Sequence, residues 1–254
     1  MNPQTKEQLI YTIQNRMDKT NAHFEDRDSF VFYDMGCPEP DTHLRGFTIR
    51  KDSCTYTDKG NFLDIFRKLS HDPRNTWRVR MPSSALSSWG NFLIDQGFTP
   101  RDERGTPAME RQLPIDYSLN HSVQWAEREE EKEQCAFIIS KAFELSFNTA
   151  KKILSPLSSQ ELAYISDDRK ILSCGILSLD PSSSYGGLYY IGTDENYRGQ
   201  GLGKELVTAM TNRAFEYGAK NVILQASTLG EFVYNHLGYR KVGKYQNFIH
   251  TNNK

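Results

Sequence analysis

One segment of this 254-residue chain constrains the fold more than any other, because it joins a strand to a helix through a glycine-rich turn. Residues 188–193 read as a strand, and residues 197–204 read Tyr-Arg-Gly-Gln-Gly-Leu-Gly-Lys. A helix is predicted to follow as far as Tyr217, with an apolar face made of Leu202, Leu206, Val207, Met210 and Ala214. Glycines let backbone N–H groups approach a charged ligand, and a helix start adds unpaired donors and the positive dipole end. The segment therefore predicts an anion site, and we expect a phosphate.

Two common phosphate-binding motifs do not fit this turn. A Walker motif needs glycine at position 198 and serine or threonine at position 205, where the chain has Arg198 and Glu205. A dinucleotide fingerprint needs glycine at position 204, or glycine or alanine at position 206, where the chain has Lys204 and Leu206. The pattern that does fit is Arg-x-x-Gly-x-Gly, which starts at Arg198.

The Arg-x-x-Gly-x-Gly pattern resembles the acetyl-CoA loop of the GCN5-related N-acetyltransferases. The similarity continues through residues 224–227 (Leu-Gln-Ala-Ser) and 233–239 (Val-Tyr-Asn-His-Leu-Gly-Tyr), in the family's order and spacing, and it covers residues 123–248. It implies the acyl-CoA N-acyltransferase fold, which is of the α/β (α+β) class with a mixed central sheet flanked by helices. The sheet is expected to splay after Thr193. The resemblance also implies acetyl-CoA as the acetyl donor.

The resemblance assigns cofactor-binding roles to the glycine turn and to the strand before it. The pyrophosphate of CoA would bind backbone N–H groups of the turn and the side chain of Arg198. The pantetheine arm would bond the backbone of Ile191 and Thr193, where a backbone N–H would also polarise the thioester carbonyl. The full predicted set is Ile191, Gly192, Thr193, Arg198, Gly199, Gln200, Gly201, Leu202, Gly203, Lys204 and Ser227.

Tyr234 is the predicted catalytic residue. Thr228 and Glu231 form a capping-box pattern that opens its helix. The predicted core stripe of this helix consists of Leu229, Phe232, Val233 and Leu237. Tyr234 falls to the side of that stripe, so it is expected to reach out of the core. In the family, the matching tyrosine protonates the departing CoA thiolate. A half-buried packing tyrosine is the alternative interpretation.

The sequence does not assign the base that would take a proton from the attacking amine. Many family members carry a glutamate on the strand before the loop, but this strand has Tyr189 and Tyr190 instead. Glu144, Asp194 and Glu195 are near in sequence, although carboxylates at helix ends and in turns usually face solvent. Water could also carry the proton, and the base is left open.

The first half of the chain is similar, more loosely, to the degenerate N-terminal half of two-copy members of this family. The similarity is carried by residues 92–98 and by residues 106–109. We therefore predict two tandem copies, a degenerate domain over residues 1–116 and an acetyl-CoA-binding domain over residues 120–254. The first copy lacks a glycine loop, and it has Leu93 at the place that corresponds to Tyr234. Residues 5–22 predict a packing helix.

Net charge and composition limit the classes of partner and the location expected for this protein. The net charge of −1 gives no reason to expect nucleic acid or an anionic membrane. No run approaches about 18 apolar residues, and the polar N-terminus lacks the apolar stretch of a signal peptide, so a cytoplasmic protein is expected. Four scattered cysteines show no metal-ligand spacing, so we predict no metal site and reduced thiols: Cys37, Cys54, Cys135 and Cys174.

The sequence thus predicts an N-acetyltransferase that moves an acetyl group from acetyl-CoA to a primary amine by direct attack. The acceptor would be a small molecule or a peptide, bound by variable loops at residues 143–156 and 180–187 and by the first domain. A homodimer is compatible with this function. The alternative is a catalytically idle acyl-CoA-binding module that acts through protein partners, and a nucleotide-binding protein is the third hypothesis.

Overall fold

The computed structural model describes residues 23–34, 45–69, 76–101, 105–154, 160–180 and 184–251. The chain forms two compact units. Unit 1 contains Met1–Thr106 and Gly243–Lys254, and unit 2 contains Pro107–Val242. The expected helix over residues 5–22 lies outside the described residues. No helix within the described part of the chain is both long enough and apolar enough to cross a membrane.

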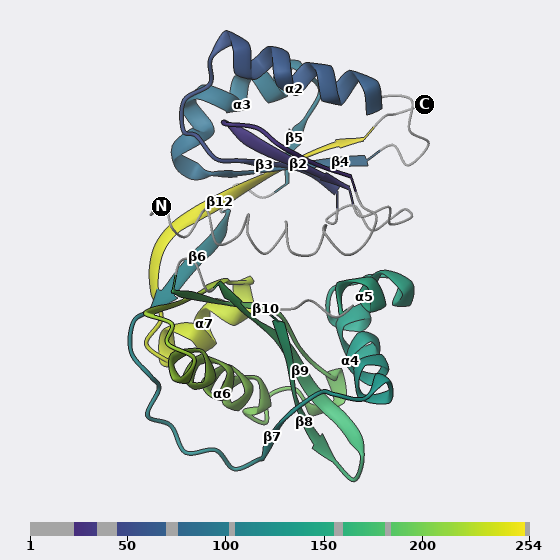
Figure 1. Cartoon of the computed structure of the whole chain (residues 1–254), viewed down its shortest axis with the longest axis vertical. Helices are drawn as coiled ribbons and strands as arrows, with labels where there is room; N and C mark the ends of the chain where they lie inside the picture. Colours follow the sequence, from purple (N-terminus) through teal and green to yellow (C-terminus); the bar gives the residue numbers. More distant parts are fainter. Residues whose placement is uncertain are drawn as a thin grey trace. The chain divides into compact units, whose positions relative to one another are not determined.

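Unit 1 is a sheet with two helices on one face (Figure 1). Its strands lie in the order β1-β2-β3-β4-β12, and β5 pairs with β12. The pairs β1/β2, β2/β3 and β4/β12 are antiparallel, whereas β3 and β4 are parallel and are connected through α2. The elements are β1 (His23–Asp26), β2 (Phe30–Asp34), β3 (Arg45–Ile49), α2 (Tyr56–Leu69), β4 (Thr76–Pro82), a 3-10 turn (Ser83–Ala85), α3 (Leu86–Asp95), β5 (Thr99–Pro100) and the end of β12 (Arg240–Thr251). Aromatic side chains dominate the core, and the rings of Phe47 and Phe62 are 4.2 Å apart.

Unit 2 has strands in the order β6-β11-β10-β9-β8-β7. Helices α4 and α5 cover one face of the sheet, and α6 and α7 cover the other (Figure 1). The elements are β6 (Thr106–Arg111), β7 (Val123–Trp125), α4 (Glu129–Ala142), α5 (Phe147–Ile153), β8 (Gln160–Asp167), β9 (Lys170–Asp180), β10 (Tyr185–Thr193), a 3-10 turn (Glu195–Tyr197), α6 (Leu202–Glu216), β11 (Asn221–Gln225), α7 (Thr228–His236) and the start of β12. This is the mixed sheet flanked by helices that the sequence predicted.

Helix α6 packs on the sheet through the predicted apolar face. All five residues of that face are buried: Leu202, Leu206, Val207, Met210 and Ala214. A Cβ added to Gly186 of β10 would lie 2.9 Å from the Ala214 Cβ, so glycine permits the close approach of helix and strand. Gly218, in the left-handed region at φ +87°, ends the helix as the pattern predicted.

The compact units divide the chain differently from the predicted boundary near residues 116–120. Residues 108–111 of β6 pair with residues 222–225 of β11, which places this strand in the sheet of unit 2. Residues 245–251 of β12 pair with β4, which returns the end of the chain to the sheet of unit 1. Strand partners that are distant in sequence set the division, and local composition carries no signal of them.

Candidate active site

The site is built where two parallel strands stop pairing. Strand β10 pairs with β11 only through residues 185–188 and 221–224. Beyond Leu188, the register of β10 continues with β9 alone. The splay therefore begins at Leu188, five residues earlier than the predicted position at Thr193. The carboxyl ends of adjacent parallel strands are where open α/β sheets bind ligands.

A bulge shapes the unpaired end of β10. Tyr189 opposes Ile176 and Gly192 opposes Cys174, so two residues, Tyr190 and Ile191, face one residue of β9. Tyr190 takes a φ of +50°, which is unusual for a residue with a side chain. The extra residue shifts the pattern in which successive side chains of β10 point to opposite faces of the sheet. A Cβ on Gly192 would meet Ala142 and Ile138 of α4 at 3.1 Å and 3.3 Å, and Ile191 packs into the core on the other face.

Hydrogen bonds connect the end of β10 to β9 and to the glycine turn. The Ser173 hydroxyl donates to the Gly192 carbonyl at 3.0 Å and lies 3.0 Å from the Thr193 hydroxyl. The Arg198 Nε donates to the Thr193 carbonyl at 3.2 Å, so this exposed arginine folds back over the strand end. The Thr193 hydroxyl is 3.6 Å from where a Cβ of Gly203 would lie. The structure therefore brings Thr193, Arg198 and the start of α6 together.

The glycine turn presents an open set of backbone donors. Gly199 and Gly201 have φ of +78° and +87°, and nothing lies within 4 Å of a Cβ at either position. Within the described residues, the N–H groups of residues 199–203 donate no hydrogen bond. The side chain of Leu202 is buried, so this residue offers only its backbone, whereas Gln200 is exposed. Unpaired N–H groups at the positive end of a 15-residue helix fit a pyrophosphate.

Helix α7 is turned differently from the prediction. Leu229 and Phe232 are 85% and 69% exposed, and the buried residues are Tyr234 at 9% and Leu237 at 3%. Tyr234 therefore faces the core of unit 2, where its ring is 6.0 Å from that of Tyr239. Burial raises the pKa of Tyr234 to about 12. The Tyr234 hydroxyl makes no hydrogen bond among the residues that the structure describes.

Ser227 caps α7, one residue earlier than the expected capping box at Thr228. Its hydroxyl accepts a hydrogen bond from the Gly230 N–H at 3.1 Å. A Cβ on Gly230 would lie 3.1 Å from the Ser227 hydroxyl and 2.8 Å from the Tyr234 ring. Ser227 and Tyr234 thus form a second group of predicted site residues, which follows β11 as the glycine turn follows β10.

Residues 117–239, which contain both groups, match the model of the Acetyltransferase (GNAT) family. This segment, which is just under half of the chain, is similar to the GNAT family. No curated protein matches the chain.

Solved structures share the fold of the whole chain. A GCN5-related N-acetyltransferase from Kribbella flavida has a TM-score of 0.74 at 15% identity, over 98% of this chain and 96% of that one. Another from Sphaerobacter thermophilus has a TM-score of 0.59 at 13% identity, over 88% and 81%. A glucosamine N-acetyltransferase region of a fungal multi-domain protein has a TM-score of 0.63 at 13% identity, over 94% of this chain and 34% of that one. At these identities the likeness establishes the fold alone.

The first turn of α6 in unit 2 contacts the linker after β6. The Lys204 Nζ lies 3.9 Å from the centre of the Tyr117 ring, and the Lys204 N–H donates to the Gly201 carbonyl. The buried Glu205 carboxylate accepts hydrogen bonds from the backbone of Asn120 and His121 and from their side chains. Burial opposes ionisation of Glu205, but these bonds lower its pKa overall. Lys204 therefore serves the linker, and sequence patterns gave no sign of this contact.

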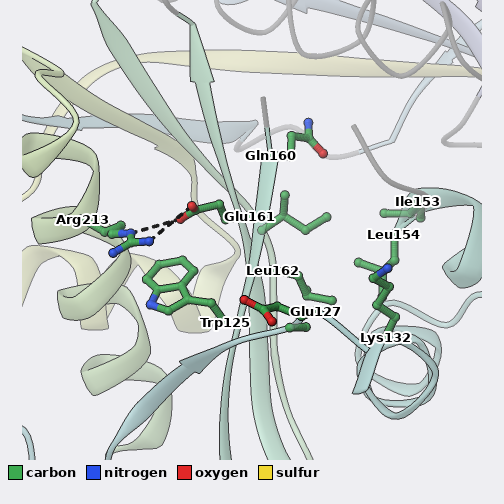
Figure 2. A pocket seen from close by; sticks show the side chains of 11 residues that line it. Trp125, Glu127, Lys132, Ile153, Leu154, Gln160, Glu161, Leu162 and Arg213 are labelled. Carbon is green, nitrogen blue, oxygen red and sulfur yellow. Dashed lines mark hydrogen bonds and ion pairs between the residues drawn. The ribbon is translucent and has the colours of Figure 1, made fainter. Parts of the chain in front are cut away.

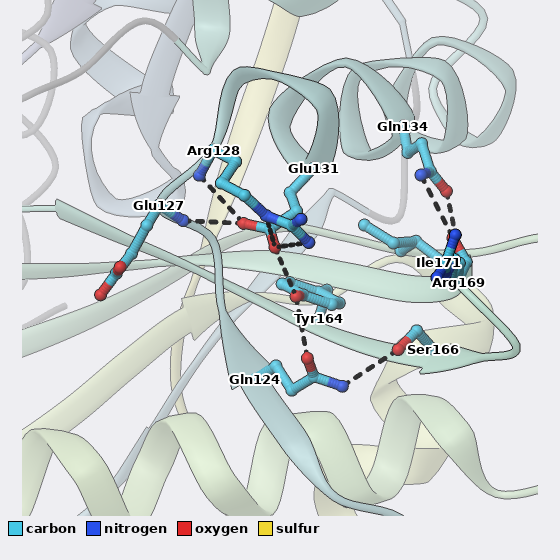
Figure 3. A network of polar contacts seen from close by, with 9 residues as sticks. All are labelled: Gln124, Glu127, Arg128, Glu131, Gln134, Tyr164, Ser166, Arg169 and Ile171. Carbon is cyan, nitrogen blue, oxygen red and sulfur yellow. Dashed lines mark hydrogen bonds and ion pairs between the residues drawn. The ribbon is translucent and has the colours of Figure 1, made fainter.

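A polar network holds the first turn of α4 (Figure 3). The Glu131 carboxylate accepts from the backbone N–H groups of Glu127 and Arg128 at 2.9 Å and 3.0 Å, and it pairs with the Arg128 guanidinium at 2.7 Å. The Tyr164 hydroxyl lies 3.0 Å from Glu131 and 2.9 Å from Gln124. Burial opposes ionisation, but the hydrogen bonds lower the pKa of Glu131 to about 2. The network fixes the helix whose other end touches Gly192.

A cavity of about 290 Å³ lies elsewhere in unit 2 (Figure 2). In it Glu161 pairs with Arg213 at 3.2 Å, and the Arg213 guanidinium lies 4.9 Å from the centre of the Trp125 ring. Its lining includes the first residues of β8, of which Gln160 pairs with Ser178 of β9. Thr193 pairs with Ser173, so the cavity and the end of β10 lie five residues apart along β9. None of the predicted cofactor residues lines it.

The described residues contain no group of three or more side chains able to hold a metal ion. Cys54, Cys135 and Cys174 are free thiols, and Cys37 lies outside the described residues. Of the predicted acceptor loops, residues 155–156 and 181–183 also lie outside them.

Proposed function

We propose that the GNAT domain transfers an acetyl group from acetyl-CoA to a primary amine by direct attack. The observation that carries this proposal is the coincidence of two features. Unpaired N–H donors open at the start of α6, and β10, the strand that leads into this turn, has lost its partner β11 beyond Leu188. A pyrophosphate fits the donors, and an extended arm fits an unpaired strand, so one ligand would satisfy both.

Individual residues have distinct roles in this proposal. Arg198 and the backbone of residues 199–203 hold the pyrophosphate, and Gly192 and Thr193 present the backbone of β10 to the pantetheine arm. The bound donor supplies an activated thioester. A backbone N–H at the bulge of β10 stabilises the oxyanion that develops on the acetyl carbonyl.

Tyr234 donates a hydrogen bond to the departing sulfur. Because burial raises its pKa to about 12, the phenol carries its proton at neutral pH. The pKa of an ordinary thiol, about 8.5, is lower, so complete proton transfer from Tyr234 would be uphill. Stabilising the thiolate by a hydrogen bond is therefore the role that fits its burial.

The two units are proposed to be tandem copies of one fold, of which unit 1 has lost its ligand loop. In unit 1 the parallel strands β3 and β4 are connected through α2, as β10 and β11 are through α6 in unit 2. Each connection is followed by a helix that ends at a left-handed glycine, Gly97 or Gly238. The acceptor is proposed to be a small-molecule or peptide amine.

Calorimetry with acetyl-CoA, ATP and NAD tests the donor assignment. We expect heat of binding with acetyl-CoA alone. Binding of ATP or NAD without acetyl-CoA would contradict the proposal. Release of free CoA thiol across a panel of amines, peptides and polyamines then tests the reaction, and binding without thiol release would favour the idle acyl-CoA-binding module.

The variant Tyr234→Phe tests the role of the phenol. We expect kcat to fall by about 100-fold, with acetyl-CoA affinity little changed, because only the hydrogen bond to the leaving sulfur is lost. Tyr239→Phe is the matched control: its hydroxyl is equally buried and lies 2.6 Å from the Thr211 hydroxyl, so its loss should lower stability without slowing turnover. Full activity in Tyr234→Phe would remove Tyr234 from the mechanism.

A further inference from the structure

Four helices in the described residues end in the same backbone motif, but one of them uses an unexpected residue. In each, the N–H two residues beyond the last helical turn bonds the carbonyl five residues earlier: Phe98 to Leu93, Leu145 to Ser140, Ala219 to Ala214 and Tyr239 to Tyr234. This motif requires a left-handed residue, usually glycine, just before that N–H. Helices α3, α6 and α7 have Gly97, Gly218 and Gly238 there, whereas α4 has Glu144 at φ +54°.

Glu144 therefore keeps a side chain where the backbone favours glycine. The left-handed conformation is unfavourable for residues with a Cβ. The carboxylate of Glu144 makes no hydrogen bond or ion pair with any described residue, so no such contact offsets the free-energy cost of this conformation. It is also exposed to solvent. Strain kept for an unengaged charged group points to a ligand.

A second strained residue lies next to the same helix end. Of the non-glycine residues with positive φ, Asp168 and Arg169 form the hairpin turn between β8 and β9, and Ser184 sits in the turn before β10. The other two are Glu144 and Tyr190, the bulged residue of β10. The ring of Phe143, the neighbour of Glu144, is 5.2 Å from the ring of Tyr190 in an edge-on contact. The fold thus brings both outliers to one place.

That place adjoins the proposed reaction. Tyr190 belongs to the stretch of β10 that has left β11, and Gly192, two residues on, packs on Ala142 of α4. Phe143 is 39% exposed, so part of its ring is available to a ligand. The partly exposed ring of Phe143 is followed in sequence by Glu144, whose carboxylate pairs with no described residue. Aromatic faces and carboxylates both attract an ammonium group, so this pair of residues favours one.

We propose that Glu144, Phe143 and Tyr190 form the seat of the acceptor, and that the acceptor arrives as a primary ammonium attached to an apolar group. Glu144 binds the ammonium, and the two rings contact the carbon skeleton beside it. This assignment rests on the proposed function for its place in the reaction, but the seat itself is defined by amine binding.

The test uses the full chain saturated with CoA and measures binding of 2-phenylethylamine by calorimetry, with 2-phenylethanol as the neutral probe. Wild type should bind the amine more tightly than the alcohol. Glu144→Gln should weaken the amine by about tenfold or more and leave the alcohol unchanged, because the substitution keeps the volume and removes the charge. Tyr190→Gly should weaken both probes. Equal affinity of wild type for the two probes, or an unchanged amine affinity in Glu144→Gln, would overturn the seat.

Glu144→Gly separates a ligand role from a structural one. It restores the usual residue of the motif, so Tm should rise by about 2–4 °C while amine binding is lost. Ser184→Gly is the matched control, since it relieves the same kind of strain at the start of β10 and should raise Tm with amine binding intact. A Glu144→Gly protein that loses stability and amine binding together would assign Glu144 to the fold and overturn the proposal.

The two proposals can fail separately. If wild type binds the amine through Glu144 but releases no CoA thiol with any acceptor, the transfer reaction fails and the seat stands. If thiol release with amines is normal in Glu144→Gln, the reaction stands and the seat is overturned.

Discussion

The same connection, a strand followed by a helix and a parallel strand, occurs once in each unit, but the helices start differently. In unit 1, α2 is closed by its own side chains: Asp58 accepts from the N–H and the hydroxyl of Thr55 at 2.8 Å and 2.6 Å, and the Thr55 hydroxyl accepts from the Asp58 N–H at 3.2 Å. In unit 2, α6 starts at Gly201, with no side-chain cap. A carboxylate thus occupies the end of one helix, and open donors occupy the end of the other.

The difference shows how little separates a helix start with open backbone donors from one that is closed by a carboxylate. A capping carboxylate both uses the donors and repels phosphate, whereas glycine leaves the donors free and the approach open. The next helices of the two units, α3 and α7, carry different residues four positions before their terminal glycines, Gly97 and Gly238. Leu93 in α3 and Tyr234 in α7 are both buried, and the carbonyl of each accepts the N–H that follows the terminal glycine. Only Tyr234 carries a hydroxyl.

Placing a carboxylate at the open end should break the comparison most strongly. Gly201→Glu would put a negative charge among the phosphates, so acetyl-CoA affinity should fall by at least about 100-fold, or about 3 kcal/mol, in calorimetry. Gly218→Glu is the control, because Gly218 has the same φ of +87° and equally open surroundings but terminates α6. Similar loss of affinity in both variants would mean that strain, and not charge at the phosphate site, is responsible.

Helix α4 of unit 2 extends the comparison. The Glu131 carboxylate accepts hydrogen bonds from backbone N–H groups at the start of α4, as the Asp58 carboxylate does at the start of α2. Glu131→Gln should lower the free energy of unfolding by about 1–3 kcal/mol, because buried N–H groups lose a charged acceptor. Glu130→Gln, at an exposed neighbouring position, should change it little. Urea denaturation measures both, and equal effects would show that Glu131 acts only through net charge.

The pH dependence of this contribution has a definite sign. The pKa of Glu131 is lowered from 4.5 to about 2 in the folded protein, so its stabilisation is complete above about pH 4.5 and is lost as the pH falls toward 2. Wild type should therefore lose stability faster than Glu131→Gln over this range. Parallel curves of unfolding free energy for the two proteins would contradict the assignment.

The smallest effect is expected at the closed end of unit 1. Asp58→Ala should reduce the free energy of unfolding by about 1 kcal/mol through loss of the cap, with acetyl-CoA affinity unchanged. Asp64→Ala, at an exposed position within α2, is the control for loss of an acidic side chain. A change in acetyl-CoA affinity in Asp58→Ala would show that α2 takes part in donor binding and would end the contrast between the units.

Much of the fold follows from local sequence signals. The glycine turn and the buried face of α6 were predicted. Each depends on backbone conformation or on periodicity within a short segment. The match of residues 117–239 to the GNAT family confirms the family resemblance of this part of the chain.

The rest was decided by tertiary structure, for physical reasons that local sequence does not carry. Helix α7 has two apolar stripes, and packing against the core, where Gly230 leaves room for the Tyr234 ring, buries Tyr234 while Phe232 stays exposed. The bulge at Tyr190 depends on register with β9, and the place of β6 and β12 depends on strands far away in sequence. The sequence by itself determined the glycine turn before α6, because the conformation of such a turn depends on its own residues. Only the fold could bring Phe143, the neighbour of Glu144, to Tyr190, because that contact results from packing α4 on β10.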